Sequence, residues 1–164
     1  MLNKIEKHIQ EIFETLRNPG LLLVSGNAPP DIMTVNWAML GCLWTRPVFM
    51  TPVKKARHCY KLIDEGGVFT VNVPRKDLFN EIAKISVVSG RETDKWSEFH
   101  LHPVKARKTE TYIVGDCGIH LECRVILKSP IDPAFLDKGI ARQIYDGQEF
   151  HDMFYGEILD VYET

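Results

Sequence analysis

Apolar residues recur at helical spacing near the start of the chain. Ile5, Ile9, Ile12 and Leu16 are separated by lysine, glutamate and glutamine, which is typical of an amphipathic helix over residues 2–17. An Asn-Pro-Gly sequence follows and ends the helix, because proline and glycine interrupt helical structure. The same spacing predicts two further helices, at residues 54–65 and 75–86.

Other apolar segments are too short for helices and are rich in β-branched residues, so we predict that they form strands. The sequence VFTVNV is typical, and a proline follows it directly. The predicted strands are residues 21–25, 32–43, 48–53, 68–73, 112–128 and 153–162. Between them, residues 89–99 and 130–148 are expected to form loops, each with a short helical piece.

These elements define the expected fold class. About six or seven strands, without a regular alternation of strand and helix, favour an antiparallel barrel over a doubly wound parallel sheet. We therefore predict a mainly β protein with flanking helices. The length of 164 residues, with no internal repeat or linker, predicts a single domain over residues 1–164.

Composition argues against several classes of protein. The formal net charge is −2, whereas a nucleic-acid-binding domain usually carries a large basic excess. No segment approaches the ~20 apolar residues of a membrane span, and the charged N-terminus lacks the apolar block of a signal peptide. We therefore expect a cytoplasmic protein that binds neither nucleic acid nor membranes.

Cysteine and histidine do not predict a metal site. The chain has four cysteines, Cys42, Cys59, Cys117 and Cys123. No two of them form a C-x-x-C pair, so we expect free and mostly buried thiols. His100 and His102 alternate along an extended segment, but two ligands do not complete a metal site.

The first candidate site is the sequence DIMTVNW, residues 31–37. A hydroxyl, an amide and an indole follow one another there, on Thr34, Asn36 and Trp37. A bound ring system needs hydrogen bonds to its edge and an apolar wall, and this segment offers both. The alternative is an ordinary barrel strand whose Trp37 belongs to the core.

The second candidate site is the basic turn at residues 54–60. Lys54, Lys55 and Arg57 lie where a predicted strand turns into a predicted helix, and free backbone N–H groups at a helix start attract anions. Arginine can also hold a phosphate through two parallel hydrogen bonds. The alternative is a solvated basic turn, because exposed charges contribute little energy.

Two further segments contain weaker candidates. In SGRETDKW, residues 89–96, Gly90 permits close approach of the backbone, and Lys95 can reach an anion or a carbonyl group. His151 stands just before the last predicted strand and is a candidate hydrogen-bond donor to a flavin or nicotinamide carbonyl. A surface histidine without a partner is the alternative for His151.

Taken together, these segments resemble the flavin reductase-like, FMN-binding split-barrel family, and especially its flavoredoxin-like branch. The family's N-x-M-T-x-x-W-x-x-x-G-x-x-W motif is matched by DIMTVNWAMLGCLW. F-T-V-N-V-P is matched letter for letter. The matching segments are residues 31–44, 55–63, 69–74, 89–96, 118–125 and 151–158. They follow in family order over nearly the whole chain.

The resemblance implies an antiparallel split barrel with bound FMN, usually as a homodimer with the flavin near the interface. Cofactor contacts are then expected along the flavin, around its phosphate and at its tail. The residues concerned are Thr34, Val35, Asn36 and Trp37, then Ala56, Arg57, His58 and Cys59, then Ser89, Gly90, Arg91 and Lys95. His151, as the catalytic candidate, and Phe154 would lie near the ring face that a nicotinamide approaches.

The implied function is an NAD(P)H-dependent flavin reductase, in which NADH or NADPH transfers a hydride to the flavin. Two alternatives stay open: an electron-transfer protein like flavoredoxin that exchanges electrons with a redox partner, and a related barrel that no longer binds flavin. Asp31, Ala56 and Cys59 keep the last alternative open, because they replace the family's Asn, Ser and Thr. The chain ends at Thr164, where many relatives continue, so a more exposed flavin is expected.

Overall fold

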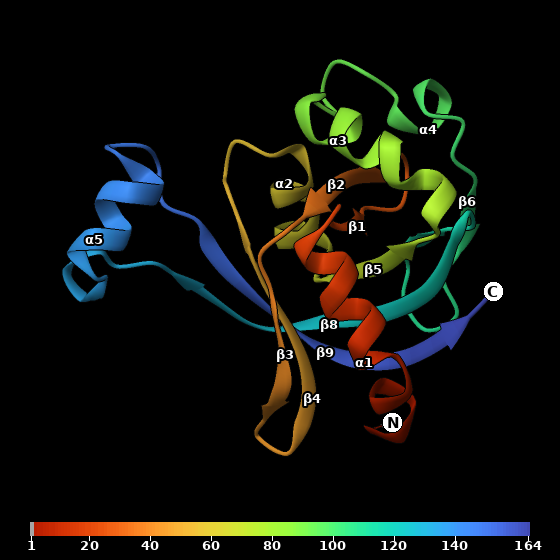
Figure 1. The fold of residues 1–164 in the computed structure, drawn as a ribbon, viewed down its shortest axis with the longest axis horizontal. Helices are drawn as coiled ribbons and strands as arrows, with labels where there is room; N and C mark the ends of the chain where they lie inside the picture. Colours follow the sequence, from red (N-terminus) through yellow and green to blue (C-terminus); the bar gives the residue numbers. More distant parts are fainter. Residues whose placement is uncertain (1) are drawn as a thin grey trace.

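Seven strands form one antiparallel sheet in the order β2-β1-β5-β8-β9-β4-β3 in a computed structural model that describes residues 2–164 (Figure 1). The strands are β1 (Leu21–Ser25), β2 (Asp31–Val35), β3 (Met39–Leu43), β4 (Arg46–Val53), β5 (Val68–Pro74), β8 (Cys117–Pro130) and β9 (Asp152–Glu163). A second, two-stranded sheet pairs β6 (Pro103–Lys105) with β7 (Tyr112–Val114). The predicted fold class, mainly antiparallel β with flanking helices, is confirmed.

The prediction of one strand over residues 32–43 is wrong. β2 pairs with β1 at one edge of the sheet, whereas β3 pairs with β4 at the opposite edge. Only residues 36–38 connect the two edges, and a connection of that length spans at most ~14 Å. The sheet must therefore curl until its edges approach, yet the edges do not pair, and the result is a split barrel.

The helices begin later than their sequence pattern predicts, except for the first. The helical segments are α1 (Leu2–Arg17), α2 (His58–Gly66), η1 (Lys76–Leu78), α3 (Phe79–Val87) and α4 (Lys95–Glu98). Residues 54–57 form a turn instead, closed by the N–H of Arg57 donating to the carbonyl of Lys54 at 2.9 Å. This turn carries the predicted basic cluster, so its cations precede α2 and lie outside it.

The long strands β8 and β9 form the back of the barrel. The predicted strand over residues 112–128 is in fact β7 and β8, with a turn between them. The pairing of β8 with β9 shifts register at Glu122/Cys123 and again between Val125 and Leu127. Such bulges increase local bend and twist, which lets two long strands follow the curvature of the barrel.

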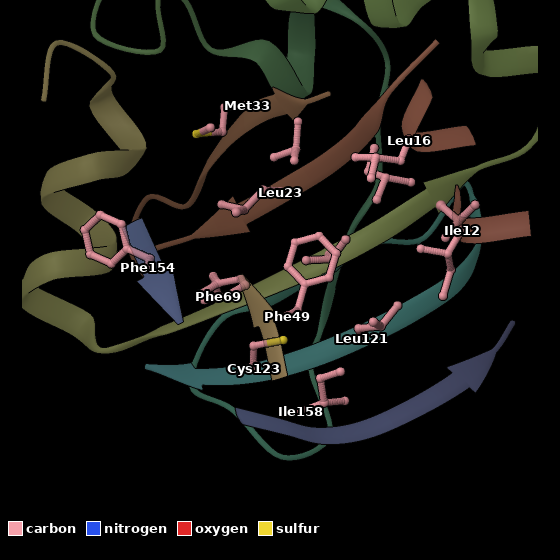
Figure 2. Packing of buried hydrophobic residues seen from close by; sticks show 14 of the residues in the cluster. Ile12, Leu16, Leu23, Met33, Phe49, Phe69, Leu121, Cys123, Phe154 and Ile158 are labelled. Carbon is pink, nitrogen blue, oxygen red and sulfur yellow. The ribbon is translucent and has the colours of Figure 1, made fainter. Parts of the chain in front are cut away.

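The barrel interior contains the main hydrophobic core (Figure 2). Phe49, Phe69 and Phe154 are its largest buried side chains, and Ile12 and Leu16 of α1 pack against them from the N-terminal helix. A second cluster lies on the other face of β1 and β2, where α3 and α4 cover the sheet. Three of the four cysteines are buried and free, as predicted, while Cys42 is exposed.

Residues 131–148 form an arm between β8 and β9 that projects away from the barrel (Figure 1). It contains three short helical pieces: η2 (Pro133–Phe135), α5 (Lys138–Ile140) and η3 (Ala141–Tyr145). Phe135 is 91% exposed, whereas Tyr145 is buried. Within residues 2–164, no helix combines the length and the apolar character needed to cross a membrane.

The close packing around Gly156 predicts a measurable loss of stability for Gly156→Ala. An added Cβ would lie 2.5 Å from Cζ of Phe69 and 2.8 Å from Cβ of Cys123. We expect the free energy of unfolding, measured by urea denaturation, to fall by about 1–3 kcal/mol. Gly66→Ala is the matched control, because nothing lies within 4 Å of its Cβ position. An equal loss in both variants would contradict the packing argument.

Candidate functional site

Two adjoining cavities run along β2, and we refer to them together as the groove. The broad cavity has a volume of about 550 Å³ and the narrow one about 230 Å³. Both are lined by Met33, Lys54, Arg57 and Val87, so they form one continuous depression. Its walls come from β2, the end of β4, the turn before α2, the end of α3 with the loop after it, and His151 just before β9. The size falls within the usual range for a cofactor site.

Residues of the connection between the sheet edges line the broad cavity. Trp37 is 49% exposed, so the interpretation of Trp37 as a core residue is wrong. The hydroxyl of Thr51 donates to its carbonyl at 3.1 Å and holds this connection against β4. The Asn36 amide donates to the carbonyl of Pro19 at 3.1 Å. Val35 is buried in the core, which leaves its backbone as the part available to a ligand.

His151 lies at the same end of the groove, and its side chain is largely buried. Its ring centroid is 5.4 Å from that of Trp37, and its Nδ1 is 3.1 Å from the hydroxyl of Tyr145. Burial lowers the pKa of His151, and the nearby cations Lys54 and Arg57 lower it further. The imidazole is therefore neutral at neutral pH, and it is not the unpartnered surface histidine of the alternative interpretation.

The basic turn supplies the cations of the groove. Lys54 and Arg57 line both cavities, and Ala56 lines the narrow one. The Arg57 guanidinium donates through Nη1 to the carbonyl of Ser86 at 3.0 Å, which leaves its other N–H groups available. No side chain caps the start of α2, so backbone N–H groups at this end of the helix keep their capacity to bind an anion.

A buried ion pair closes the narrow cavity. Nζ of Lys95 is 3.4 Å from Oδ1 of Asp31, with side chains only 4% and 7% exposed, and it also donates to the carbonyl of Ile32. Lys95 therefore reaches the groove with its charge already paired. The sequence pattern does not predict this pairing, because Asp31 and Lys95 lie far apart in the sequence.

Two neighbours complete the surroundings of the Asp31 carboxylate. The thiol of Cys59 donates to Oδ2 at 3.4 Å. Burial, followed by the charge of Asp31, raises the pKa of this thiol well above its usual range, so it stays protonated. Nδ1 of His58 is 3.3 Å from the same oxygen but has no hydrogen bond with suitable geometry among the described residues.

The loop of residues 88–94 borders the groove with its backbone more than with its side chains. A Cβ at Gly90 would lie 2.1 Å from Oδ1 of Asp31, so glycine is required for this loop to approach β2. Ser89 lines the narrow cavity beside it. Arg91 is exposed and lines neither cavity, which places it outside the groove.

The expected position of Phe154 at the ring face is wrong. Its side chain is 1% exposed and belongs to the barrel core. Its ring packs edge-on against the ring of Tyr60, with 5.3 Å between the ring centroids. Successive side chains of a strand point to opposite faces. On β9, Phe154 points inward, whereas its neighbour Met153 lines a separate apolar cavity outside the barrel.

The split barrel with a groove of this composition is the architecture of a flavin reductase-like protein. The family model "Flavin reductase like domain" matches residues 17–164, and the chain belongs to that family.

Solved structures of similar fold agree with this assignment. Flavoredoxin of Desulfovibrio vulgaris is 25% identical, with 90% of this chain and 70% of that chain covered and a TM-score of 0.71. An FMN-binding protein from Thermus thermophilus is 14% identical, with 90% and 72% covered and a TM-score of 0.70. An NADH:FAD oxidoreductase of Streptomyces globisporus is 15% identical, with 88% and 75% covered and a TM-score of 0.66.

A double-mutant cycle tests whether the contributions of Asp31 and Lys95 to the free energy of unfolding depend on one another. Lys95→Met leaves a buried carboxylate without its cation, and we expect the free energy of unfolding to fall by about 3–5 kcal/mol. In Asp31→Asn/Lys95→Met no charge remains, so the double variant should lose less than the two single variants combined. The measurement is urea denaturation at neutral pH.

The control for this cycle is Lys84→Met. Lys84 forms an exposed pair with Glu81 at 2.8 Å, and its loss should change stability by no more than about 0.5 kcal/mol. Strictly additive losses at positions 31 and 95 would show that the buried pair does not stabilise the fold.

Proposed function

We propose that this protein binds FMN in the groove and acts as an NAD(P)H-dependent flavin reductase. The observation that supports this most strongly is the composition of the groove: Trp37 and neutral His151 line the broad cavity, the uncapped start of α2 borders the narrow one, and the cations Lys54 and Arg57 line both. Flavin mononucleotide carries the groups that suit such a lining, a planar ring and a phosphate.

Under this proposal, the phosphate depends mainly on two cations. Arg57 has free N–H groups and Lys54 lies beside it, whereas the Ala56 side chain has no donor and the Cys59 thiol already donates to Asp31. The paired charge of Lys95 contributes little to the phosphate. The chain thus lacks the two side-chain hydroxyls of the family's phosphate turn, and the contact would depend on the Arg57 guanidinium, whose charge-assisted hydrogen bonds to a phosphate are strong, and on backbone N–H groups.

At the ring end, the residues position the cofactor and limit access of water. Trp37 forms an apolar wall, Thr34 contributes a hydroxyl, and His151 provides a neutral imidazole beside them. Bound FMN would supply the capacity to accept a hydride from NADH or NADPH, so the protein itself needs no general base. A neutral N–H donor near the ring edge would stabilise negative charge that develops there.

A second candidate is an electron-transfer protein. Flavoredoxin of Desulfovibrio vulgaris is a relative at 25% identity, and the half-exposed Trp37 leaves the broad cavity accessible from solvent. Steady-state oxidation of NADH and NADPH separates the candidates, because a reductase turns over with free flavin as acceptor and a carrier oxidises either nucleotide poorly.

FMN titration of the purified protein tests the cofactor, and Arg57→Ala tests the phosphate contact. We expect saturable binding with Kd in the micromolar range or tighter, roughly −8 kcal/mol. Arg57→Ala should weaken it by about 1–3 kcal/mol, the scale of hydrogen bonds to charged groups. Arg91→Ala is the matched control, since Arg91 lies outside the groove. A protein that stays colourless with FMN would instead be a barrel that no longer binds flavin.

His151→Ala should affect the reaction more than the binding of FMN. Without the imidazole we expect the rate of flavin reduction, followed by stopped-flow absorbance, to fall by about tenfold or more. The Kd for FMN should change much less, because the neutral His151 does not supply the charge that would hold the phosphate. His102→Ala on the surface is the control. Equal losses in rate and affinity would mean that His151 holds the flavin.

A further inference from the structure

The arm of residues 131–148 projects from the barrel, yet it contacts two residues of the groove. Tyr145 is 5% exposed, and its ring packs against Phe150 and His151 at centroid distances of 4.5 and 5.6 Å. Three residues later, Oε1 of Gln148 accepts a hydrogen bond from Nζ of Lys54 at 3.0 Å. The arm therefore brings two polar groups to the groove.

The hydrogen bond between Tyr145 and His151 can have either of two directions. A neutral imidazole has one N–H, so Nδ1 either accepts from the phenol or donates to it. Burial raises the pKa of Tyr145, and a hydrogen bond from the backbone of His151 to the phenol opposes this increase. The phenol thus retains its proton at neutral pH and can donate it.

The surroundings favour donation from the phenol. Among the described residues, Nδ1 of His151 is the only acceptor within hydrogen-bond distance of the Tyr145 hydroxyl, at 3.1 Å. If Nδ1 carried the proton instead, the phenol proton would be left in a buried position without a partner, which costs free energy. Donation to Nδ1 places the imidazole proton on Nε2, the nitrogen that makes no hydrogen bond within residues 2–164.

We propose that Tyr145 is a positioning residue that holds His151 as the Nε2–H tautomer, so that a neutral N–H donor is available to the groove beside Trp37. The assignment of the tautomer stands on the contacts of Tyr145 alone. Its role toward a flavin rests on the proposed function. Under that function, Tyr145 keeps one orientation and one donor atom of His151 ready at the ring end, without touching the cofactor itself.

The tautomer is measurable in the protein without flavin. Long-range ¹H–¹⁵N correlation spectra of uniformly labelled protein at neutral pH distinguish the two ring nitrogens, and the signals absent from His151→Gln identify His151. We expect a single Nε2–H pattern in the parent protein and a mixture of both tautomers in Tyr145→Phe. Tyr145→Phe retains the aromatic ring, so packing against Phe150 is preserved.

Tyr155→Phe is the matched control. Tyr155 lies on β9, and its hydroxyl makes no hydrogen bond within the described residues, so the His151 pattern should not change. A mixed or Nδ1–H pattern in the parent protein would overturn the proposal. An unchanged pattern in Tyr145→Phe would overturn it as well.

A second measurement separates this proposal from the proposed function. In FMN-loaded protein, Tyr145→Phe should slow flavin reduction by about three- to tenfold, the equivalent of one hydrogen bond, and leave the Kd for FMN unchanged. If FMN does not bind but the tautomers respond as expected, the proposed function fails and the positioning by Tyr145 stands. If FMN binds and the tautomers do not respond, the positioning is wrong and the proposed function stands.

Discussion

The short connection between β2 and β3 is the constraint on which the rest of the structure depends. β2 and β3 are the two edges of the sheet, and only Asn36, Trp37 and Ala38 join them. A chain of that length cannot cross a flat seven-stranded sheet, so the sheet curls and the opening between its edges remains. The same three residues then stand at the open side of the barrel, which places Trp37 on the groove and half exposed.

The Asp31 carboxylate organises the polar groups at the narrow end of the groove. Asp31 pairs with Lys95 and accepts from the Cys59 thiol, and Gly90 allows the loop to approach closely. The three departures from the family pattern are therefore not equivalent. Asp31 and Cys59 are in direct contact, whereas the Ala56 side chain simply lacks a donor. The cations left free, Lys54 and Arg57, determine the charge that a ligand meets.

The residues of the broad cavity are contacted by the arm of residues 131–148, which projects away from the barrel. The arm before β9 brings the Tyr145 hydroxyl to His151 and the Gln148 amide to Lys54. One buried phenol and one polar side chain thus connect an exposed segment to both the neutral and the cationic residues of the groove. Phe154 lies on β9, three residues beyond His151, and its side chain packs in the barrel core instead of lining the groove.

The sequence by itself determined the elements whose signals are local. Apolar spacing identified α1, runs of β-branched residues identified most strands, and ordered motifs identified the family. Only the tertiary structure decided the division of residues 32–43 into two edge strands, the inward direction of Phe154, and the pairing of Asp31 with Lys95. The contact of Tyr145 with His151 could not be predicted from the sequence either, because a tyrosine in a polar loop gives no periodic signal. These features depend on register and on contacts between distant segments, which local patterns do not encode.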